Sequence, residues 1–404
     1  MKKCIAFFLT VLLAAVLFVL PAAAQVTVEE GYDYTRFAND DITLNVYNWG
    51  LYISDGTDDS MDVVKEFEEL TGINVNYTTF DTNESLYSKL KSGGSEYDVI
   101  IPSDYMIGKM IKEGMLEKLD YANIPNYAKI GDTYKSQSFD PENEYSVPYT
   151  WGVVGIVYNT TMVDDPVTSW NSLWDPRYTG QILMFNNSRD AYAIASKKLG
   201  LSLNPSDEGD VALATEELKA QKSMVQAYVM DEIFDKMEGG EAALAPYYAG
   251  DALIMIEDNP DLAFCIPAEG TNFFIDAMCI PKGCKNKEAA EMFINFMCET
   301  EIALANTEFI GYSSPHTEAS ALLPEELKNS PIMYPAQEIM DTTEVFEVLP
   351  EEIAQLMDKQ WSDVRSYDES GSSRYMIPIM LVLAVGVVVL ILRHRAIKKF
   401  RDDY

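Results

Sequence analysis

The hydrophobic positions of this chain switch repeatedly between the period of a strand and that of a helix. Residues 42–46 alternate between apolar and polar side chains, which predicts a strand. A helix follows, capped by Ser60, with its apolar residues on one face and a stop at Gly72. The same reasoning predicts strands at 73–77 and 97–101 and helices at 84–90 and 106–113. Strands that alternate with helices are typical of an α/β unit with a largely parallel sheet.

The second half of the chain continues this pattern with longer helical stretches. Residues 148–158 and 272–281 are predicted strands. Helices are predicted at 215–221, 231–237 and 287–296, and a closing amphipathic helix at 351–365. No internal repeat is found. A body of about 350 residues is too long for one simple core and predicts two lobes.

Two apolar runs lie at the ends of the chain. Residues 1–24 combine Lys2 and Lys3, an apolar run and the small residues of PAAA at 21–24, which is typical of a secretory signal peptide. Residues 375–392 are uncharged and apolar, and the basic residues of 393–404 follow at once. This order predicts one membrane helix with a cytoplasmic basic tail. A buried core helix is the alternative. Residues 25–40 are expected to be a polar lead-in, and 369–374 a tether.

The charge of the chain narrows the class of ligand. It has 64 Asp and Glu against 30 Lys and Arg, a formal net charge of −34. Nucleic acid is excluded, because phosphate binding needs a basic face. Cations are the natural ligands of an acidic cleft, although the acidity could serve solubility alone. His316 is the one histidine between the two apolar runs, so a histidine-rich metal site is not expected, and neither is a cofactor.

Four cysteines lie between the two apolar runs: Cys265, Cys279, Cys284 and Cys298. Export would permit disulfides, and four cysteines allow three full pairings. Free thiols fit the sequence equally well. None of the spacings is a CxxC pair, so a zinc site is not predicted.

Aromatic and polar residues stand together where three predicted strands end. These segments are 47–52 (YNWGLY), 102–105 (PSDY) and 272–276 (NFFID). Ligands of open α/β sheets bind at the carboxyl ends of strands. Aromatic rings can stack on methylene groups and offer their faces to cations, and carboxylates accept hydrogen bonds from ammonium groups. This mixture favours a methylene chain with ammonium ends, although each aromatic ring could also belong to the core.

These segments carry a resemblance to a known family. The chain resembles the spermidine/putrescine-binding proteins, the extracytoplasmic substrate-binding subunits of polyamine ABC importers, over about residues 41–365. The resemblance rests on the order and spacing of YNW at 47–49, GINV at 72–75, NESLYSKL at 83–90, YDVIIPS at 97–103, KEG at 112–114, VPYTWG at 147–152, TSWNSLW at 168–174, IGY at 310–312 and YP at 334–335.

The resemblance implies a two-lobed α/β fold of the periplasmic-binding-protein type, with crossover hinge strands. Lobe 1 would hold 41–147 and 277–320, and lobe 2 would hold 148–275 and 321–368. It also implies a binding protein and not an enzyme: a monomer that takes up spermidine or putrescine outside the cell, held at the cell membrane by its C-terminal helix, and delivers the polyamine to an ABC permease.

Family positions can be transferred one by one. The resemblance implies that Trp49 and Tyr52 pack on the polyamine, that Ser103 and Tyr105 form a polar and aromatic pair, and that Asp276 and Asp190 bind amines. Tyr248 and Phe274 stand where the family has tryptophans. Asn187 replaces a second carboxylate, Gly50 replaces a hydroxyl residue, and the region near Phe346 lacks an expected glutamine.

Other readings stay open at this point. Asp276 could be a turn or cap residue, and Asp190 a carboxylate favoured by a helix dipole. Asp104 and Asp251 are interpreted as solvated or structural, and His316 as structural. The ligand could be another amine solute, and the chain could be a polyamine sensor. An exported hydrolase using Ser103 or His316 is disfavoured, since no G-x-S-x-G motif occurs.

Overall fold

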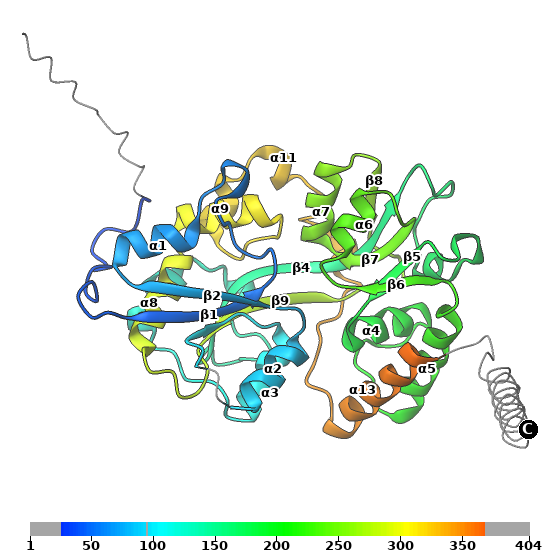
Figure 1. Ribbon diagram of the computed structural model, residues 1–404, viewed down its shortest axis with the longest axis horizontal. Helices are drawn as coiled ribbons and strands as arrows, with labels where there is room; N and C mark the ends of the chain where they lie inside the picture. Colours follow the sequence, from blue (N-terminus) through cyan, green and yellow to red (C-terminus); the bar gives the residue numbers. More distant parts are fainter. Residues whose placement is uncertain (1–25, 94–95, 368–404) are drawn as a thin grey trace, which may run out of the picture.

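The computed structural model describes residues 26–93 and 96–367, which form two lobes side by side (Figure 1). One sheet path runs through both lobes in the order β2-β1-β3-β9-β4-β7-β5-β6, and β8 pairs with β4. The predicted α/β class with two lobes is confirmed. The strands are β1 (Thr43–Trp49), β2 (Asn74–Phe80), β3 (Val99–Ile100), β4 (Ser146–Asn159), β5 (Ile182–Phe185), β6 (Val225–Val229), β7 (Leu244–Tyr248), β8 (Leu262–Cys265) and β9 (Phe273–Cys279).

The lobes meet along two long strands at the centre of the sheet. The first part of β4 pairs antiparallel with β9 in lobe 1, and its last part pairs antiparallel with β7 and β8 in lobe 2. The outer strands of each lobe are parallel, as predicted. A third segment crosses beside them, because Glu344 bridges to Asn272 and accepts from the N–H of Phe273 at 2.9 Å.

Helices cover both faces of the sheet in each lobe (Figure 1). In lobe 1, α1, α8 and α9 lie on one face and α2 and α3 on the other. In lobe 2, α6 and α7 lie opposite α4, α5 and α13. The helices are α1 (Val63–Thr71), α2 (Asn83–Lys91), α3 (Asp104–Lys112), α4 (Ser188–Lys198), α5 (Glu208–Gln221), α6 (Ile233–Glu238), α7 (Ala249–Asp258), α8 (Lys287–Met297), α9 (Thr300–Ile310), α10 (Thr317–Leu322), α11 (Glu325–Lys328), α12 (Gln337–Met340) and α13 (Glu351–Ser366).

Local sequence signals explain several helix ends. The N-cap of α1 is Asp62, whose carboxylate accepts from the N–H of Lys65 at 3.0 Å, so the predicted cap at Ser60 was wrong. Gly72 ends α1 with φ 73°, a left-handed conformation that glycine adopts without cost. Thr82 and Ser85 form a capping box at the start of α2.

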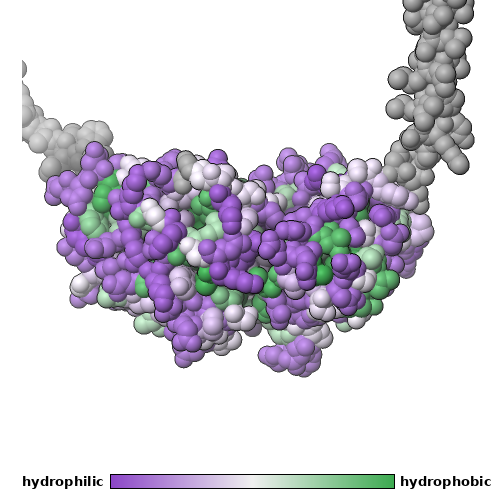
Figure 2. All heavy atoms as spheres, turned by 90° about the horizontal axis from the view of Figure 1, so that it is seen from below, coloured by the Kyte–Doolittle hydropathy of each residue, from purple (hydrophilic) through white to green (hydrophobic). Residues whose placement is uncertain are grey.

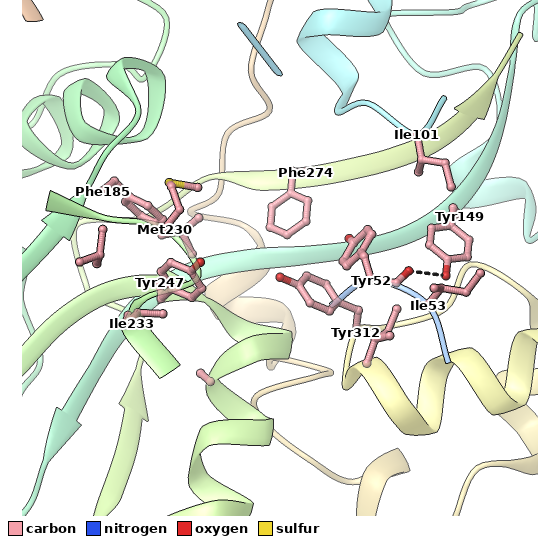
Figure 3. Packing of buried hydrophobic residues seen from close by; sticks show 14 of the residues in the cluster. Tyr52, Ile53, Ile101, Tyr149, Phe185, Met230, Ile233, Tyr247, Phe274 and Tyr312 are labelled. Carbon is pink, nitrogen blue, oxygen red and sulfur yellow. Dashed lines mark hydrogen bonds between the residues drawn. The ribbon is translucent and has the colours of Figure 1, made fainter. Parts of the chain in front are cut away.

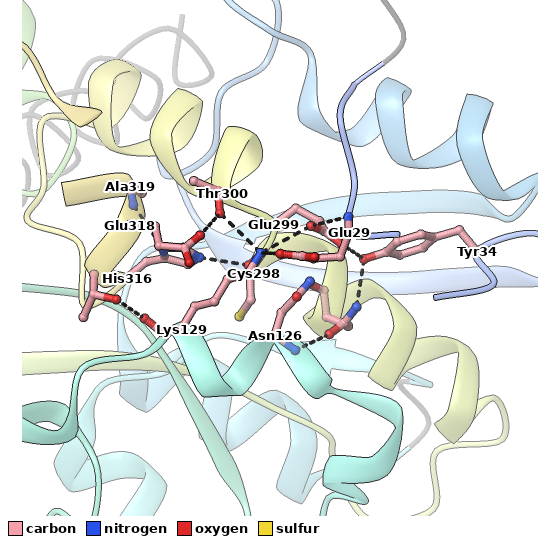
Figure 4. Close-up of polar contacts among 12 residues, drawn as sticks. Glu29, Tyr34, Asn126, Lys129, Cys298, Glu299, Thr300, His316, Glu318 and Ala319 are labelled. Carbon is pink, nitrogen blue, oxygen red and sulfur yellow. Dashed lines mark hydrogen bonds and ion pairs between the residues drawn. The ribbon is translucent and has the colours of Figure 1, made fainter. Parts of the chain in front are cut away.

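The first described segment of the chain, from Val26 on, packs on lobe 1 (Figure 4). Val26 and Tyr34 are buried, and the Tyr34 hydroxyl donates to Glu299 at 2.6 Å. Lys129 forms ion pairs with Glu29 at 2.9 Å and with Glu299 at 3.7 Å. We call Glu29, Tyr34, Lys129 and Glu299 the clamp. Residues expected to be a polar lead-in therefore contribute buried contacts to lobe 1.

Three further predictions concern the surface, the thiols and the termini. Hydrophilic residues dominate the face of the molecule shown in Figure 2. The four cysteines are free thiols: Cys265, Cys279, Cys284 and Cys298. Within 26–93 and 96–367, no helix is long and apolar enough to cross a bilayer. The predicted signal peptide, tether, membrane helix and basic tail lie outside the described residues.

Candidate functional site

A cavity of about 710 Å³ lies between the lobes, lined by residues from both. It brings together all nine side chains that the sequence singled out: Trp49, Tyr52, Ser103, Tyr105, Asn187, Asp190, Tyr248, Phe274 and Asp276. Trp49 ends β1, Phe274 and Asp276 belong to β9, and Tyr248 ends β7. Trp49 and Tyr248 thus stand at strand ends as expected, whereas Phe274 and Asp276 lie within β9 and reach the cavity from the first half of that strand.

Asp276 is the most enclosed carboxylate at the centre of the cavity. Its side chain is 4% exposed, and its Oδ2 accepts from the Tyr52 hydroxyl at 2.6 Å. Its Oδ1 is buried and has no hydrogen-bond partner among the described residues. Burial raises the pKa of Asp276 to about 6. A buried acceptor without a partner costs about 1–3 kcal/mol, so this oxygen is poised for a donor from a ligand.

Asp190 lies at the start of α4, where the backbone and two side chains hold it. Asn187 caps the helix and accepts from the N–H of Asp190 at 2.8 Å. The Asp190 Oδ2 accepts from the Asn187 amide at 2.6 Å and from the Tyr248 hydroxyl at 2.9 Å. Burial raises the pKa of Asp190. Asn187 therefore acts as a helix cap that orients the carboxylate next to it.

A third carboxylate, Glu84, lines the cavity from lobe 1. It stands in the first turn of α2 and accepts from the Tyr105 hydroxyl at 2.8 Å. Asn83 beside it exchanges hydrogen bonds with Ser103, at 3.0 Å between the amide nitrogen and Oγ. Burial raises the pKa of Glu84. Ser103 is thus tied to α2, next to the carboxylate.

The fourth carboxylate, Asp251, joins the two lobes. It lies in the first turn of α7 and accepts from the hydroxyl of Tyr312, which follows α9, at 2.8 Å. The Tyr312 ring rests on Gly250, where an added Cβ would lie 2.1 Å from the ring. Burial raises the pKa of Asp251 to about 8. Asp251 lines the cavity, and we had not predicted it as a site residue.

The four carboxylates share one design. Each accepts a hydrogen bond from a tyrosine, and Glu84, Asp190 and Asp251 each stand in the first turn of a helix. The positive end of a helix dipole stabilises a carboxylate by about 0.3–1 kcal/mol, and up to about 2 in partly buried sites. Burial raises the pKa of each tyrosine, so the hydroxyls remain donors.

Aromatic rings form a continuous wall between these carboxylates (Figure 3). The ring of Tyr248 lies 5.5 Å from that of Phe274, which lies 6.2 Å from that of Tyr312. Tyr312 then packs edge-on against Tyr52 at 4.8 Å. Such a wall offers apolar area for methylene groups and negative ring faces for cations.

The described residues that line the cavity include no lysine, arginine or histidine. The nearest cation stands behind the wall: Arg189, 4% exposed, lies over the Phe346 ring at 4.4 Å and over Tyr105 at 5.6 Å. Its guanidinium donates to Asn204 at 2.6 Å and to the carbonyl of Glu347 at 3.1 Å. The described lining therefore offers acidic groups and no basic one, which favours cations over anions as ligands.

Asp104, which we interpret from the sequence as solvated or structural, and His316, which we interpret as structural, lie outside the cavity lining. Asp104 is fully buried and accepts from the N–H of Ile275 at 3.3 Å. His316 caps α10, accepting from the N–H of Ala319 at Nδ1, and its Nε2 lies 3.0 Å from the carbonyl of Cys298. In the part of the chain that the structure describes, no group of three His, Cys, Asp or Glu side chains is placed to hold a metal.

Several lining residues were not predicted from the sequence: Gly50, Leu51, Asn83, Glu84, Met230, Asp231, Phe234, Tyr247, Asp251, Asn272, Tyr312 and Phe346. Asp251 was set aside as solvated or structural. Glu84 had a usable signal, because it follows the cap of a helix that we predicted. Asp231 opens the helix predicted at 231–237, but β6 was not predicted, so no strand end pointed to it.

Comparisons with known proteins identify the family of this chain. A sequence model of the family described as bacterial extracellular solute-binding protein matches residues 95–343. The spermidine/putrescine-binding periplasmic protein of Escherichia coli K12 is 36% identical over 76% of this chain and 87% of its own length. A putrescine-binding periplasmic protein of Pseudomonas aeruginosa is 29% identical over 81% of this chain and 93% of its own.

A solved structure of a substrate-binding protein is similar to this chain in sequence and fold. The substrate-binding protein PotD of a spermidine/putrescine ABC transporter from Streptococcus pneumoniae is 39% identical, with a TM-score of 0.68. The match covers 81% of this chain and 99% of that one. The expectation that this chain binds a solute and is not an enzyme agrees with these relatives.

Proposed function

The chain belongs to the bacterial extracellular solute-binding protein family, and we propose that it captures a polyamine outside the cell and delivers it to an ABC importer. The observation that carries the proposal is the lining of the cavity: five carboxylates, four of them each held by a tyrosine, an aromatic wall and no basic residue among the described lining residues. Relatives at 36% identity are named for binding spermidine and putrescine.

The chemistry of the wall matches a polyamine better than a metal ion or a neutral solute. A metal ion would gather several oxygen ligands around one point. Here the carboxylates stand apart, each bound to a different tyrosine. A linear polyamine presents ammonium groups separated by methylene chains, so it can reach separate carboxylates while its methylenes cover the rings. Asp276 would receive the donor that its Oδ1 lacks.

Binding would also favour the closed form of the molecule. The cavity takes residues from both lobes, and the Tyr312–Asp251 hydrogen bond joins them. A ligand that contacts both walls stabilises the closed arrangement through its differential affinity for that form. Closure would then present a defined surface to a permease. We propose that Trp49, Tyr52, Ser103 and Tyr105 contribute lobe 1 contacts and Asn187, Asp190, Tyr248, Phe274 and Asp276 the others.

The deciding experiment is calorimetric titration of the full chain, purified in detergent. Putrescine, spermidine and spermine are compared with a neutral diol as control. Saturable binding of a polyamine with one site per chain, and no heat with the diol, is expected. No heat with any polyamine, from folded protein free of bound ligand, would move the function to another solute.

We further propose that the apolar residues 375–392 hold the protein at the membrane, with the binding lobes outside. The support is the sequence alone: an uncharged run followed at once by Arg393, Arg395, Lys398, Lys399 and Arg401. An anchor keeps the binding lobes near the importer at a high local concentration. Cell membranes washed with concentrated salt should retain the full-length protein. Its release into the wash would contradict the anchor.

A further inference from the structure

Gly50 and Asp231 face each other across the cleft at the rim of the cavity. Gly50 follows β1 in lobe 1, and Asp231 follows β6 in lobe 2. A Cβ added to Gly50 would lie 2.3 Å from Oδ2 of Asp231. The carboxylate therefore occupies the space that any other side chain at position 50 would fill.

The backbone at position 50 does not itself require glycine. Eleven other glycines, Gly72 and Gly311 among them, adopt positive φ values that disfavour other residues, and Gly50 is not one of them. What position 50 provides is the absence of a side chain. Because only the end of the Asp231 side chain meets the added Cβ, a small residue there would displace the carboxylate and leave the fold intact.

The two ends of the cavity differ in their openness. At the Glu84 end, Tyr105 and Phe346 line the cavity, and Arg189, 4% exposed, closes it from behind. At the Gly50 end, Leu51 is 59% exposed and Asp231 is exposed. A longer ligand can therefore extend at only one end, past Asp251 and toward Asp231. Asp231, Asp251 and Asp276 line the same cavity, and repulsion from Asp231 and Asp276 adds to the effect of burial in raising the pKa of Asp251.

The Asp231 carboxylate is available to a ligand. Among the described residues, no lysine or arginine forms an ion pair with it. The neighbouring charges, Asp81 and Glu232, are negative too. Asp231 lies beside Gly50, which has no side chain, at the open end of an acidic cavity. Its carboxylate can accept hydrogen bonds from an ammonium group.

We propose that Gly50 and Asp231 form the subsite for the outermost ammonium group of a triamine, and that this pair decides how well triamines compete with diamines. The inference rests on the proposed function, because it assigns one more contact to the same ligand. A diamine that occupies the enclosed carboxylates leaves Asp231 empty. A triamine reaches it only while Gly50 leaves the carboxylate in place.

The test compares the affinities of the full chain for spermidine and putrescine in four proteins: the wild type, Asp231→Asn, Gly50→Ala and the double variant. Asp235→Asn is the matched control, since it removes the same charge from an exposed position on α6 outside the cavity lining. Asp231→Asn and Gly50→Ala should each weaken spermidine binding about tenfold and change putrescine binding less than about twofold. The double variant should be no weaker than either single one, because both changes act through one carboxylate.

The outcomes separate the inference from the proposed function. Wild-type protein that binds neither amine overturns both. Wild-type protein that binds both amines, with Asp231→Asn unchanged or weakened equally for the two, overturns the subsite alone. Additive losses in the double variant would show that Gly50 does not act through Asp231, and would also overturn the pairing. The Asp235→Asn control must keep the wild-type ratio of affinities, or the effect is one of general charge.

Discussion

The clamp of lobe 1 and the centre of the cavity each contain a tyrosine hydroxyl that donates to a buried carboxylate, but the surroundings of the two carboxylates differ. In the clamp, the Tyr34 hydroxyl donates to Glu299 at 2.6 Å, and in the cavity the Tyr52 hydroxyl donates to Asp276 at 2.6 Å. Both carboxylates are buried. Glu299 also has Lys129 and the N–H of Glu29, whereas Asp276 keeps one oxygen without a partner.

This difference separates a structural carboxylate, Glu299, from Asp276, which we propose to bind the ligand. The clamp holds its own cation, so its hydrogen bonds and charge are satisfied within the fold. The cavity supplies carboxylates and tyrosines but no cation among its described lining residues. Buried charges are paired in stable proteins, so a site with the anion and without the cation implies that the cation comes from outside.

The largest expected effect is on ligand binding at Asp276. Asp276→Ala should weaken polyamine binding by about 2–5 kcal/mol, since a charged contact in a desolvated cleft is lost. The stability of the empty protein should not fall, because a buried carboxylate without a cation partner is removed. Titration calorimetry and thermal unfolding of the same sample check both statements. Wild-type affinity in this variant would remove Asp276 from the site.

The reciprocal change in the clamp should affect stability and not binding. Glu299→Gln should destabilise the empty protein by about 2–3 kcal/mol, because Lys129 and Tyr34 lose a charged partner at a site that is 1% exposed. Ligand affinity should stay within about twofold. Glu301→Gln is the control, since Glu301 accepts only an exposed N–H, that of Thr27. If Glu299→Gln weakened binding as strongly as Asp276→Ala, the comparison between the two carboxylates would fail.

The pH dependence of binding should follow the cavity carboxylates. Burial raises the pKa of Asp276 to about 6 and that of Asp251 to about 8, and a bound ammonium group favours their ionised forms. Binding therefore releases protons, and affinity rises with pH. It should be about tenfold weaker at pH 5 than at pH 7, from Asp276 alone. Titrations in two buffers of different ionisation heat measure the protons released.

The same two aspartates should make the stability of the empty protein fall with rising pH, whereas the affinity for the ligand rises. Their pKa values are raised above the unfolded value near 4, so the folded chain retains protons that the unfolded chain loses. Their contribution to stability is therefore greatest below about pH 4 and is lost as the pH rises toward 8. For the binding prediction, a ligand affinity that does not change between pH 5 and pH 8 would contradict the proposal that these two carboxylates bind the ligand.

The smallest effect is expected beside the clamp, at His316. His316→Asn should change stability by less than about 1 kcal/mol and leave ligand affinity unchanged. Asparagine keeps the N-cap bond to Ala319, because its side-chain oxygen can accept as Nδ1 does, and only the contact with Cys298 is lost. Denaturant unfolding measures the change. Loss of binding in this variant would give His316 a role that its position does not suggest.

The sequence was sufficient for lobe 1 and for the side chains at strand ends. Alternating apolar residues located β1 and β2, a buried run located β3, and Trp49 and Tyr105 follow from where β1 and β3 end. Asp276 lies in the middle of β9 and was found through the family resemblance. Lobe 2 was harder, because α4 is buried on nearly all sides and shows no helical period. The strands β5, β6 and β7 have four or five residues each, too few to show a clear period. Without β6 and β7, nothing placed Asp231 and Asp251 in the cavity lining.

The order of strands in lobe 1 bears on when the chain can fold. β9, residues Phe273–Cys279, lies between β3 and β4, and it is made only after nearly all of lobe 2. Until then β3 lacks its neighbour on that side, and the sheet cannot close over its core. Such long-range pairing slows folding. A chain built this way cannot complete the sheet of lobe 1 until residue 279 has been made, so the finished lobe is a product of late synthesis.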